Sequence, residues 1–328
     1  MDKQGFRVLL EKRKCNEAQI EASMAMAERF EAYLQQPGRE ASAETAWEFS
    51  RQLIAKGQNS EENYIALIRY CWFIKNNEMF VALLELVDGG EVGGNLYQRV
   101  GERFGTTLQD EIFAGIGVTP YGTPTPEKPA TLQPVIRRLE QAVGKAACQD
   151  FLSASLRDLP DAYYQGEREK YDRAGNIDAY LRQRKEAFLG ELEACQRDGR
   201  LFFSQEITDE VLEFVRKDPE MGGGRREGNI IYEVKIPYQT KEYLAATDPT
   251  MKRFYGCHCP WARTAIKNQD VQPAETFCYC SGGFHKKAWE VIFKQLLRVE
   301  VLESILWGDE RCRFAIYLPE EALAGNEA

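Results

Sequence analysis

Histidine is scarce in this chain of 328 residues, which contains two, and long hydrophobic runs are missing. The most apolar stretch, Tyr64–Ile74, is interrupted by Arg69 and is too short to cross a bilayer. The first residues, MDKQGFRVLLEKRK, contain no sizeable apolar segment of the kind that a secretory signal needs. We therefore expect a cytoplasmic protein with no membrane partner.

Positive charge is also in short supply, because the formal net charge is −9. Proteins that bind nucleic acids present a cationic face to the phosphate backbone, so we expect no nucleic-acid partner. With 44% apolar and 28% charged residues, the composition is that of a globular protein, and the length allows two domains. The sequence leaves the oligomeric state open.

The pattern along the chain predicts an α+β protein, with a helical N-terminal part followed by an α/β module that contains an antiparallel hairpin. Apolar residues such as Tyr64, Leu67 and Cys71 recur at helical spacing. Five prolines near residue 126 indicate an extended connector that cannot be helical. The predicted parts are a helical domain (1–118), the Pro-rich connector (119–134), a helical segment that packs on the C-terminal module (135–220), and a ligand-binding α/β module (221–328).

Within the last part, a change of pattern at Met221 marks the start of the α/β module. The residues IIYEVKIPY are β-branched and aromatic, as is typical of a strand. We predict a helix over 285–297, with Trp289, Ile292, Phe293 and Leu296 on one face, then strands over 298–306 and 311–318 around a tight turn, and a frayed tail over 320–328.

The hairpin places one acidic residue in an apolar row. If Leu306 pairs with Arg311, then Ile305 faces Cys312, and Glu303 lies on the same side as these residues. A buried carboxylate needs a proton, a cationic partner or a metal. Alternatively, Glu303 lies at the sheet margin and reaches water, and the sequence leaves both alternatives open.

Metal-ligating and reactive side chains are concentrated in residues 257–285, which we call the window. These 29 residues hold both histidines and four of the nine cysteines. The segments YGCHCPWAR and FCYCSGGFH carry two C-x-C pairs separated by 18 residues. Alternate residues of a strand face the same side, so each pair can present its thiols together. Thiolate with imidazole is a Zn²⁺-type ligand set, which makes zinc the candidate cofactor. The candidate metal ligands are Cys257, His258, Cys259, Cys278, Cys280, Glu303 and Cys312.

Without an export signal, the cysteines indicate free thiols, metal ligands or redox groups and not disulfides. Buried free cysteines often pack as small hydrophobic residues, and this interpretation suits Cys71, Cys148 and Cys195. In the window, the clustering with both histidines favours a functional or metal role. We therefore expect Cys278, Cys280 and Cys312 to converge with at least one residue of the Cys257–Cys259 segment.

Basic residues flank the window in an otherwise acidic protein. Arg253 and Arg263 are candidates for holding an anionic small molecule through charge-assisted hydrogen bonds. Trp261 and Tyr279 are candidates for the apolar walls of the same pocket. The alternatives are a solvated basic rim and an ordinary aromatic core.

The last 50 residues resemble the 4-vinyl-reductase-like domain, a small-ligand-binding α/β module. The resemblance rests on a cysteine, a glycine-containing helix, a strand with an acidic residue and the motif G-D-x-x-C-x-F, here GDERCRF. Phenol-sensing members hold zinc with two such cysteines, matched by Cys278 and Cys312, and with a third cysteine and a glutamate. Here Ser304 and Val301 stand at those two positions. The candidate replacements are Glu303, Cys280, Cys257, Cys259 and His258.

The ending ESILWGDERCRF is also similar to the aminothiazoline-carboxylate hydrolase family, and the segments KIPY, CHCPW and CYCSGGF resemble an uncharacterised bacterial family. We expect a small-molecule-binding protein with a Cys/His-rich site in the C-terminal module, for which zinc is the candidate cofactor. One alternative is a hydrolase of a small carboxylate-bearing compound, with a cysteine nucleophile or zinc-bound water and His258 or Glu303 as the base. Another is a thiol redox or metal-handling protein. The residues alone leave open whether the protein is an enzyme.

Overall fold

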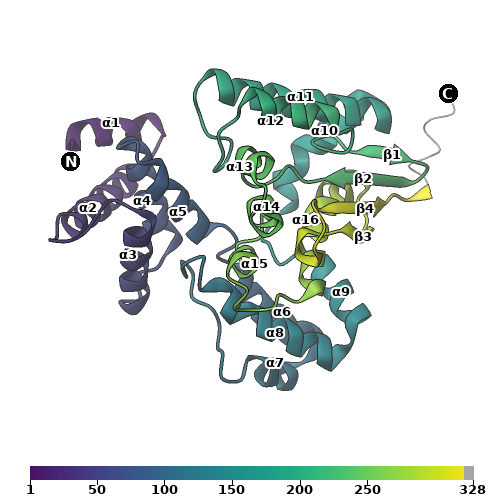
Figure 1. Ribbon diagram of the computed structural model, residues 1–328, viewed down its shortest axis with the longest axis horizontal. Helices are drawn as coiled ribbons and strands as arrows, with labels where there is room; N and C mark the ends of the chain where they lie inside the picture. Colours follow the sequence, from purple (N-terminus) through teal and green to yellow (C-terminus); the bar gives the residue numbers. More distant parts are fainter. Residues whose placement is uncertain (321–328) are drawn as a thin grey trace. The chain divides into compact units, whose positions relative to one another are not determined.

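The computed structural model describes residues 1–320 and confirms the expected α+β class (Figure 1). The chain is mostly helical, with a small antiparallel sheet near its C-terminal end. It divides into two units, of which the first is Met1–Thr131 and the second begins at Leu132. The predicted tail over 320–328 lies, from residue 321 onward, outside the described residues.

The first unit is helical, as the periodicity predicted, and its helices begin where polar side chains cap them. The Asn16 side chain accepts a hydrogen bond from the Gln19 amide and Gln19 returns one, which is a capping box. Ser42 and Ser60 cap the next two helices in the same manner. The helices are α1 (Lys3–Lys12), α2 (Glu17–Leu34), α3 (Ala43–Ala55), α4 (Glu61–Phe73), α5 (Asn77–Val87), α6 (Val92–Phe104) and α7 (Thr106–Phe113).

The prediction that the Pro-rich segment 119–134 is an extended connector that cannot be helical was wrong, because helix α8 (Lys128–Val143) begins inside it. Pro129 lies in the first turn, where its missing N–H would have no intrahelical acceptor anyway. Pro134 lies inside the helix and removes one hydrogen bond, yet the apolar side of α8 is buried around it. The buried Lys128 ammonium donates to backbone carbonyls at the end of α5, with Glu85 O at 2.6 Å.

The second unit combines helices with a four-stranded antiparallel sheet in the order β1-β2-β4-β3, as far as the described residues extend (Figure 1). The strands are β1 (Arg225–Glu227), β2 (Ile230–Val234), β3 (Arg298–Glu303) and β4 (Arg313–Tyr317). The helices that follow α8 are α9 (Lys145–Ser153), α10 (Gln165–Ala174), α11 (Ile177–Arg197), α12 (Asp209–Lys217), α13 (Thr240–Ala245), α14 (Pro249–Gly256), α15 (Arg263–Asn268) and α16 (Cys278–Phe293), with short 3₁₀ turns η1 (Asp161–Tyr164), η2 (Glu275–Phe277) and η3 (Ile305–Trp307).

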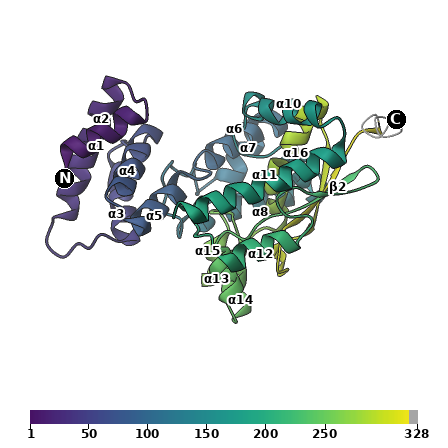
Figure 2. The same ribbon diagram turned by 90° about the horizontal axis from the view of Figure 1, so that it is seen from above.

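One face of this sheet is covered by α11 and α16, which share an apolar core with the strands. Figure 2 shows α11 as the long helix that runs across α16. The buried residues of this core include Tyr180 from α11, Trp289 from α16, and Val299, Phe314 and Ile316 from the strands. The predicted apolar row of the hairpin is therefore confirmed for Val299, Val301, Phe314 and Ile316, and α16 packs on it.

The predicted C-terminal helix has the right core face but the wrong ends. It begins at Cys278, seven residues before His285, and ends at Phe293, because Lys294 takes a left-handed conformation with φ 55°. Leu296, which we expected on the buried face, lies beyond the helix and is 88% exposed. Among residues 1–320, no helix combines the length and apolar character needed to cross a membrane.

A glycine sets the distance between α16 and α9. A Cβ atom at Gly283 would lie 2.4 Å from Ser153 O and 2.6 Å from Ser155 N. Both are backbone atoms, so no side-chain rotation can relieve the clash. We expect Gly283→Ala to destabilise the second unit by about 2 kcal/mol, because overpacking against backbone forces the helix outward. Urea unfolding followed by circular dichroism measures this loss.

Gly190 provides the matched control, since it also lies within a helix, α11, and its added Cβ would meet nothing within 4 Å. Gly190→Ala is expected to stabilise the protein by about 0.5–1 kcal/mol through helix propensity. Equal effects of the two substitutions would contradict the close approach of α9 and α16.

Candidate ligand-binding site

The two C-x-C pairs do not lie on strands, so the predicted same-side arrangement of their thiols is wrong. Cys278 and Cys280 lie in the first turn of α16, where residues two apart point about 200° from each other. The Cys278 Sγ atom lies 2.9 Å from Ser304 Oγ, whereas Cys280 Sγ accepts a hydrogen bond from the Leu156 amide at 3.3 Å. Cys257 follows the last residue of α14 and begins an irregular segment.

A β-bulge changes the predicted register of the hairpin. Val301 pairs with Phe314, but the next pair is Glu303 with Arg313, so that Leu302 is an extra residue on β3. Because side chains alternate between the faces of a strand, one extra residue reverses the side on which the following residues lie. The strands are also shorter than predicted, and a 3₁₀ turn occupies part of their connection.

The bulge takes Glu303 out of the apolar row, and the predicted pairing of Ile305 opposite Cys312 is not formed. The Glu303 carboxylate accepts two hydrogen bonds from Arg311, both of 2.9 Å, and its side chain is 32% exposed. The Arg311 guanidinium lowers the pKa of Glu303. Glu303 is therefore a partly exposed, ion-paired residue at the sheet margin.

The thiols of the window nevertheless gather near the start of β4. Cys257, Cys259 and Cys312 belong to one apolar cluster, to which Ile305 also contributes. The Cys312 thiol is hydrogen-bonded to the Ile305 backbone, next to the Ser304 hydroxyl that Cys278 contacts. The structure thus brings Cys312 together with Cys257 and Cys259, while Cys280 points toward Leu156.

Burial keeps these thiols in their protonated form. It raises the pKa of Cys257 to about 11, with the neighbouring Cys312 as the next cause. Burial also raises the pKa of Cys259, Cys278, Cys280 and Cys312. The thiolate is the reactive form of cysteine. Several of these thiols could be charged at the same time only if a bound metal ion displaced their protons.

The zinc site implied by the 4-vinyl-reductase-like resemblance is only partly matched. Ser304 stands where the third cysteine belongs, and its hydroxyl does lie beside Cys278. Val301, at the glutamate position, is buried and offers no donor atom. In the chain up to residue 320, no three His, Cys, Asp or Glu side chains lie in a geometry that one metal ion could share. Zinc binding stays a prediction.

His258 is held by the backbone. Its Nε2 atom lies 2.5 Å from the Ile236 carbonyl oxygen and, as the donor, carries the proton there. Burial lowers the pKa of His258 to about 3, so the ring is neutral at neutral pH. The ring nitrogen that would face a metal or substrate is therefore Nδ1.

His285 belongs to a buried ionic group centred on Glu233 of β2, which the sequence reading overlooked. His285 Nδ1 lies 2.7 Å from Glu233 Oε2, and Trp289 Nε1 and Arg184 donate to Oε1 at 3.0 and 2.8 Å. Burial alone raises the pKa of Glu233, but the Arg184 charge and the His285 hydrogen bond outweigh it and bring the pKa to about 2. Burial lowers the pKa of His285, so a neutral ring donates to a carboxylate.

A signal for this group was present in the sequence. In the strand IIYEV, Glu233 has the same parity as the buried Ile231, so it faces the side that packs against α16. A carboxylate on the apolar side of a strand needs partners. Those partners come from positions 184, 285 and 289, which no local pattern connects to the strand.

Lys235, one residue beyond β2, is the other group that the sequence reading missed. Its backbone N–H donates to the Cys312 carbonyl at 3.1 Å and extends the β2–β4 ladder. Its Nζ donates to Ser281 Oγ on α16 at 3.0 Å and lies 5.9 Å from the Phe284 ring centre. Within residues 1–320, no carboxylate forms an ion pair with the half-buried Lys235.

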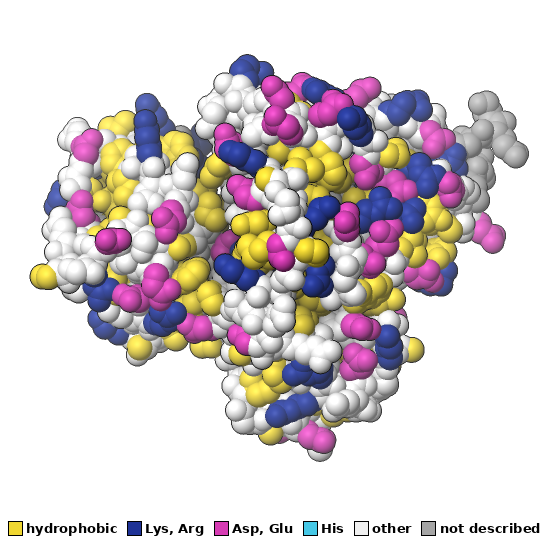
Figure 3. Space-filling view, in the orientation of Figure 1, with side chains coloured by type: hydrophobic (Ala, Val, Ile, Leu, Met, Phe, Trp, Pro, Cys, Tyr) yellow, Lys and Arg dark blue, Asp and Glu magenta, His cyan; other side chains and the backbone are white. Residues whose placement is uncertain are grey.

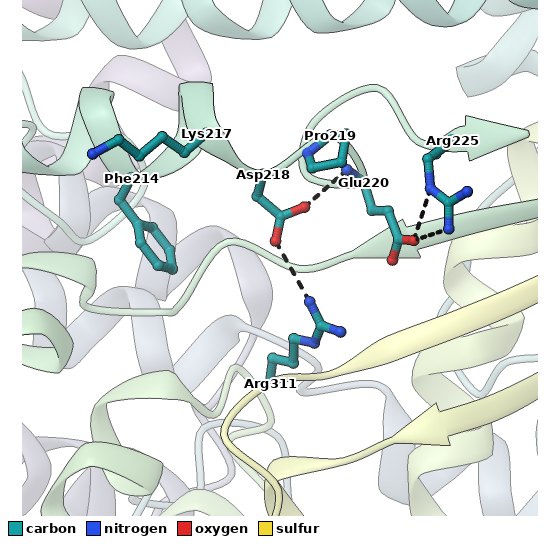
Figure 4. A pocket seen from close by; sticks show the side chains of 7 residues that line it. All are labelled: Phe214, Lys217, Asp218, Pro219, Glu220, Arg225 and Arg311. Carbon is teal, nitrogen blue, oxygen red and sulfur yellow. Dashed lines mark hydrogen bonds and ion pairs between the residues drawn. The ribbon is translucent and has the colours of Figure 1, made fainter.

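Two cavities adjoin in the second unit, and the inner one opens beside Lys235 and Cys312. The inner cavity, of about 170 Å³, is lined by Lys235, Cys312 and a largely apolar wall. The outer cavity, of about 410 Å³, is more open to solvent and is drawn in Figure 4. Phe214, Asp218 and Arg311 line both, and Figure 4 shows Asp218 and Arg311 pointing toward each other. These shared residues place the two cavities next to each other.

The four residues predicted to bind a ligand do not line either cavity. Arg263 is buried, and its guanidinium lies 4.2 Å from the ring centre of Tyr238. Trp261 is buried, and its carbonyl accepts a hydrogen bond from Gln133 of α8. Arg253 is half-buried in α14. Tyr279 belongs to α16 and packs against its core. A role for these four in ligand binding stays a prediction.

Comparison with known proteins gives one match. A family model described as a family of unknown function (DUF6144) matches residues 241–323, which include the cysteine–histidine window, α16 and the β3–β4 hairpin. Glu233 and Lys235 precede the matched region. Neither the curated proteins nor the solved structures include a match to this chain.

The ionic group around Glu233 predicts how stability depends on pH. We expect Glu233→Gln to destabilise the protein by about 3 kcal/mol at pH 7, because Arg184 is left buried without its counter-charge. In the parent protein, Glu233 contributes stability above its ordinary pKa of 4.5 that is lost as the pH falls toward about 2. The lowered pKa of His285 adds a loss that begins as the pH falls below about 6.5.

Urea unfolding monitored by tryptophan fluorescence between pH 7 and pH 3 tests this, since Trp289 touches the group. The acid loss of stability below pH 4.5 should be shallower in Glu233→Gln than in the parent. Glu206→Gln is the control, because Glu206 is 64% exposed and pairs with Lys241 at the surface. A control effect as large as that of Glu233→Gln would contradict the assignment.

Proposed function

We propose that the second unit binds a small compound with an anionic group, such as a carboxylate, in the inner cavity. The observation that carries the proposal is Lys235, a half-buried ammonium group in the cavity wall with no ion-pair partner among residues 1–320. A cation removed from water is costly without a counter-charge. A ligand carboxylate would supply that charge through a charge-assisted hydrogen bond.

The other cations around the cavities already have acidic partners. Arg311 is held in a two-point contact by Glu303, and Lys217 pairs with Glu213 at 2.9 Å. On the face shown in Figure 3, acidic and basic side chains are intermixed over the second unit. Selection of an anion is therefore assigned to Lys235 and not to a broad positive surface.

The walls and size of the inner cavity indicate what kind of compound fits. An apolar cavity of about 150 Å³ is sufficient for benzene. A cavity of about 170 Å³ suits a compound of similar size. The apolar wall favours a short hydrocarbon or ring portion next to the anionic group. It is formed by Phe214, Met221, Val234, Pro237, Tyr243 and Ile305.

The enzymatic and redox alternatives have less support. A hydrolase with a cysteine nucleophile and a thiol redox protein both need a thiolate, and burial raises the pKa of each thiol in the window. Of the two bases considered for a hydrolase, Glu303 is engaged by Arg311, and His258 Nε2 is engaged by the Ile236 carbonyl. Ligand binding requires neither a charged thiol nor a free base.

Zinc binding is the prediction that the resemblance adds. Elemental mass spectrometry of protein purified without a histidine tag should find about one zinc ion per chain. The zinc should be lost in the double variant Cys278→Ser, Cys312→Ser, since thiolate ligands dominate such sites. The control is Cys15→Ser in the first unit. Protein that stays zinc-free even after incubation with zinc would contradict the prediction.

For anion binding, we expect Lys235→Met to abolish the stabilisation that small carboxylates give the parent protein. Methionine retains much of the apolar stem and removes the charge. Thermal-shift and calorimetric titrations with propionate, benzoate and pyruvate measure the effect. We expect a loss of affinity of at least about tenfold, as for other hydrogen bonds to charged groups.

Lys217→Met is the matched control, because Lys217 lines only the outer cavity and is 74% exposed. It should bind the carboxylates as the parent does. The proposal fails if the parent binds no carboxylate, or if both variants bind with the parent's affinity.

A further inference from the structure

The inner cavity contains a second charge, opposite in sign to that of Lys235, whose one ion pair is longer than a hydrogen bond. Asp218 follows α12 and lines both cavities. Its Oδ1 atom accepts a hydrogen bond of 2.8 Å from the Glu220 amide. Its Oδ2 atom lies 3.7 Å from Arg311 NH1, which is beyond hydrogen-bond distance (Figure 4).

The remaining charged groups of the inner cavity are satisfied by their neighbours. Glu310 pairs with Lys252 at 3.2 Å. Arg311 directs Nε and NH2 to the carboxylate of Glu303, each at 2.9 Å. Once these pairs are set aside, the cavity presents one ammonium group and one carboxylate to a ligand.

Lys185, another cation near Asp218, does not bind the Asp218 carboxylate through a hydrogen bond. The Lys185 ammonium donates to three backbone carbonyls, those of Val215, Asp218 and Met221. These bonds hold the segment that carries Asp218 and leave its Oδ2 atom without a hydrogen-bond donor among the described residues. Asp218 is thus positioned by its backbone, and its side chain is 18% exposed toward the cavities.

We propose that the ligand is a small zwitterion, with its carboxylate at Lys235 and its ammonium group at Asp218. The inference rests on the proposed function and names the class of compound that the same cavity takes. A dianion is disfavoured because Arg311, the other cation of the cavity, already gives two donors to Glu303. A small amino-carboxylate also suits a volume of about 170 Å³.

Two opposite charges also give the cavity a means of selection. A compound with only a carboxylate gives Asp218 Oδ2 no hydrogen-bond donor, and one with only an amine gives Lys235 no counter-charge. Each unmatched charge must be desolvated on binding without compensation, which weakens affinity. The amino-carboxylate is the ligand that satisfies both ends.

The test compares binding of glycine, alanine, β-alanine and γ-aminobutyrate with binding of propionate and ethylamine by isothermal titration calorimetry. The full chain is used. At least one amino-carboxylate should bind about tenfold or more tightly than propionate. Asp218→Asn should remove that preference and retain propionate binding, because asparagine keeps the acceptor for the Glu220 amide. Asp198→Asn, which changes an exposed carboxylate at the end of α11, should retain the preference.

The outcomes separate this inference from the proposed function. If propionate binds as tightly as every amino-carboxylate, or if Asp218→Asn keeps the preference, the zwitterion is wrong while anion binding at Lys235 stands. If neither class of compound binds the parent protein, both proposals fail. An unchanged circular dichroism spectrum and thermal midpoint in Asp218→Asn would show that a lost preference is not a loss of fold.

Discussion

The carboxylate of Glu233 is the point at which the sheet and its two covering helices are joined. It lies on β2 and accepts hydrogen bonds from Arg184 of α11 and from His285 and Trp289 of α16. A buried carboxylate is tolerated only when such partners compensate for its lost hydration. The group therefore specifies one relative placement of these three elements, and other packings of the same apolar faces would leave a charge buried alone.

That placement brings the chemistry of the second unit to one region. With α16 held against β2, Ser281 meets Lys235 one residue beyond the strand. The β2–β4 ladder then sets Cys312 beside Lys235, and both line the inner cavity. Lys185 donates to one carbonyl in the last turn of α12 and to two in the segment that follows it, and so holds the segment that carries Asp218. The cavity is bounded by groups from distant parts of the chain, each held by its own polar contacts.

The crowded thiols have a different character from the cavity. Their burial disfavours the thiolate, and each charged neighbour would raise the pKa of the next thiol further, as Cys312 does for Cys257 and Cys278. A divalent cation would reverse this effect, since metal binding releases the thiol protons. Without metal the cluster is an uncharged, apolar part of the core, and bound metal would be needed to make it a charged site.

The sequence by itself determined the α+β class, the helical first unit and the part of the hairpin's apolar row that Val299, Val301, Phe314 and Ile316 form. These depend on periodicity and capping, which act over a few residues. The start of α16 at Cys278 and the bulge at Leu302 escaped prediction, because neighbours from other elements decide whether a glycine-rich turn or an extra residue is accommodated. Only the tertiary structure decided the surroundings of Glu233, Lys235 and Asp218, because the groups that contact each charge lie far away in the sequence.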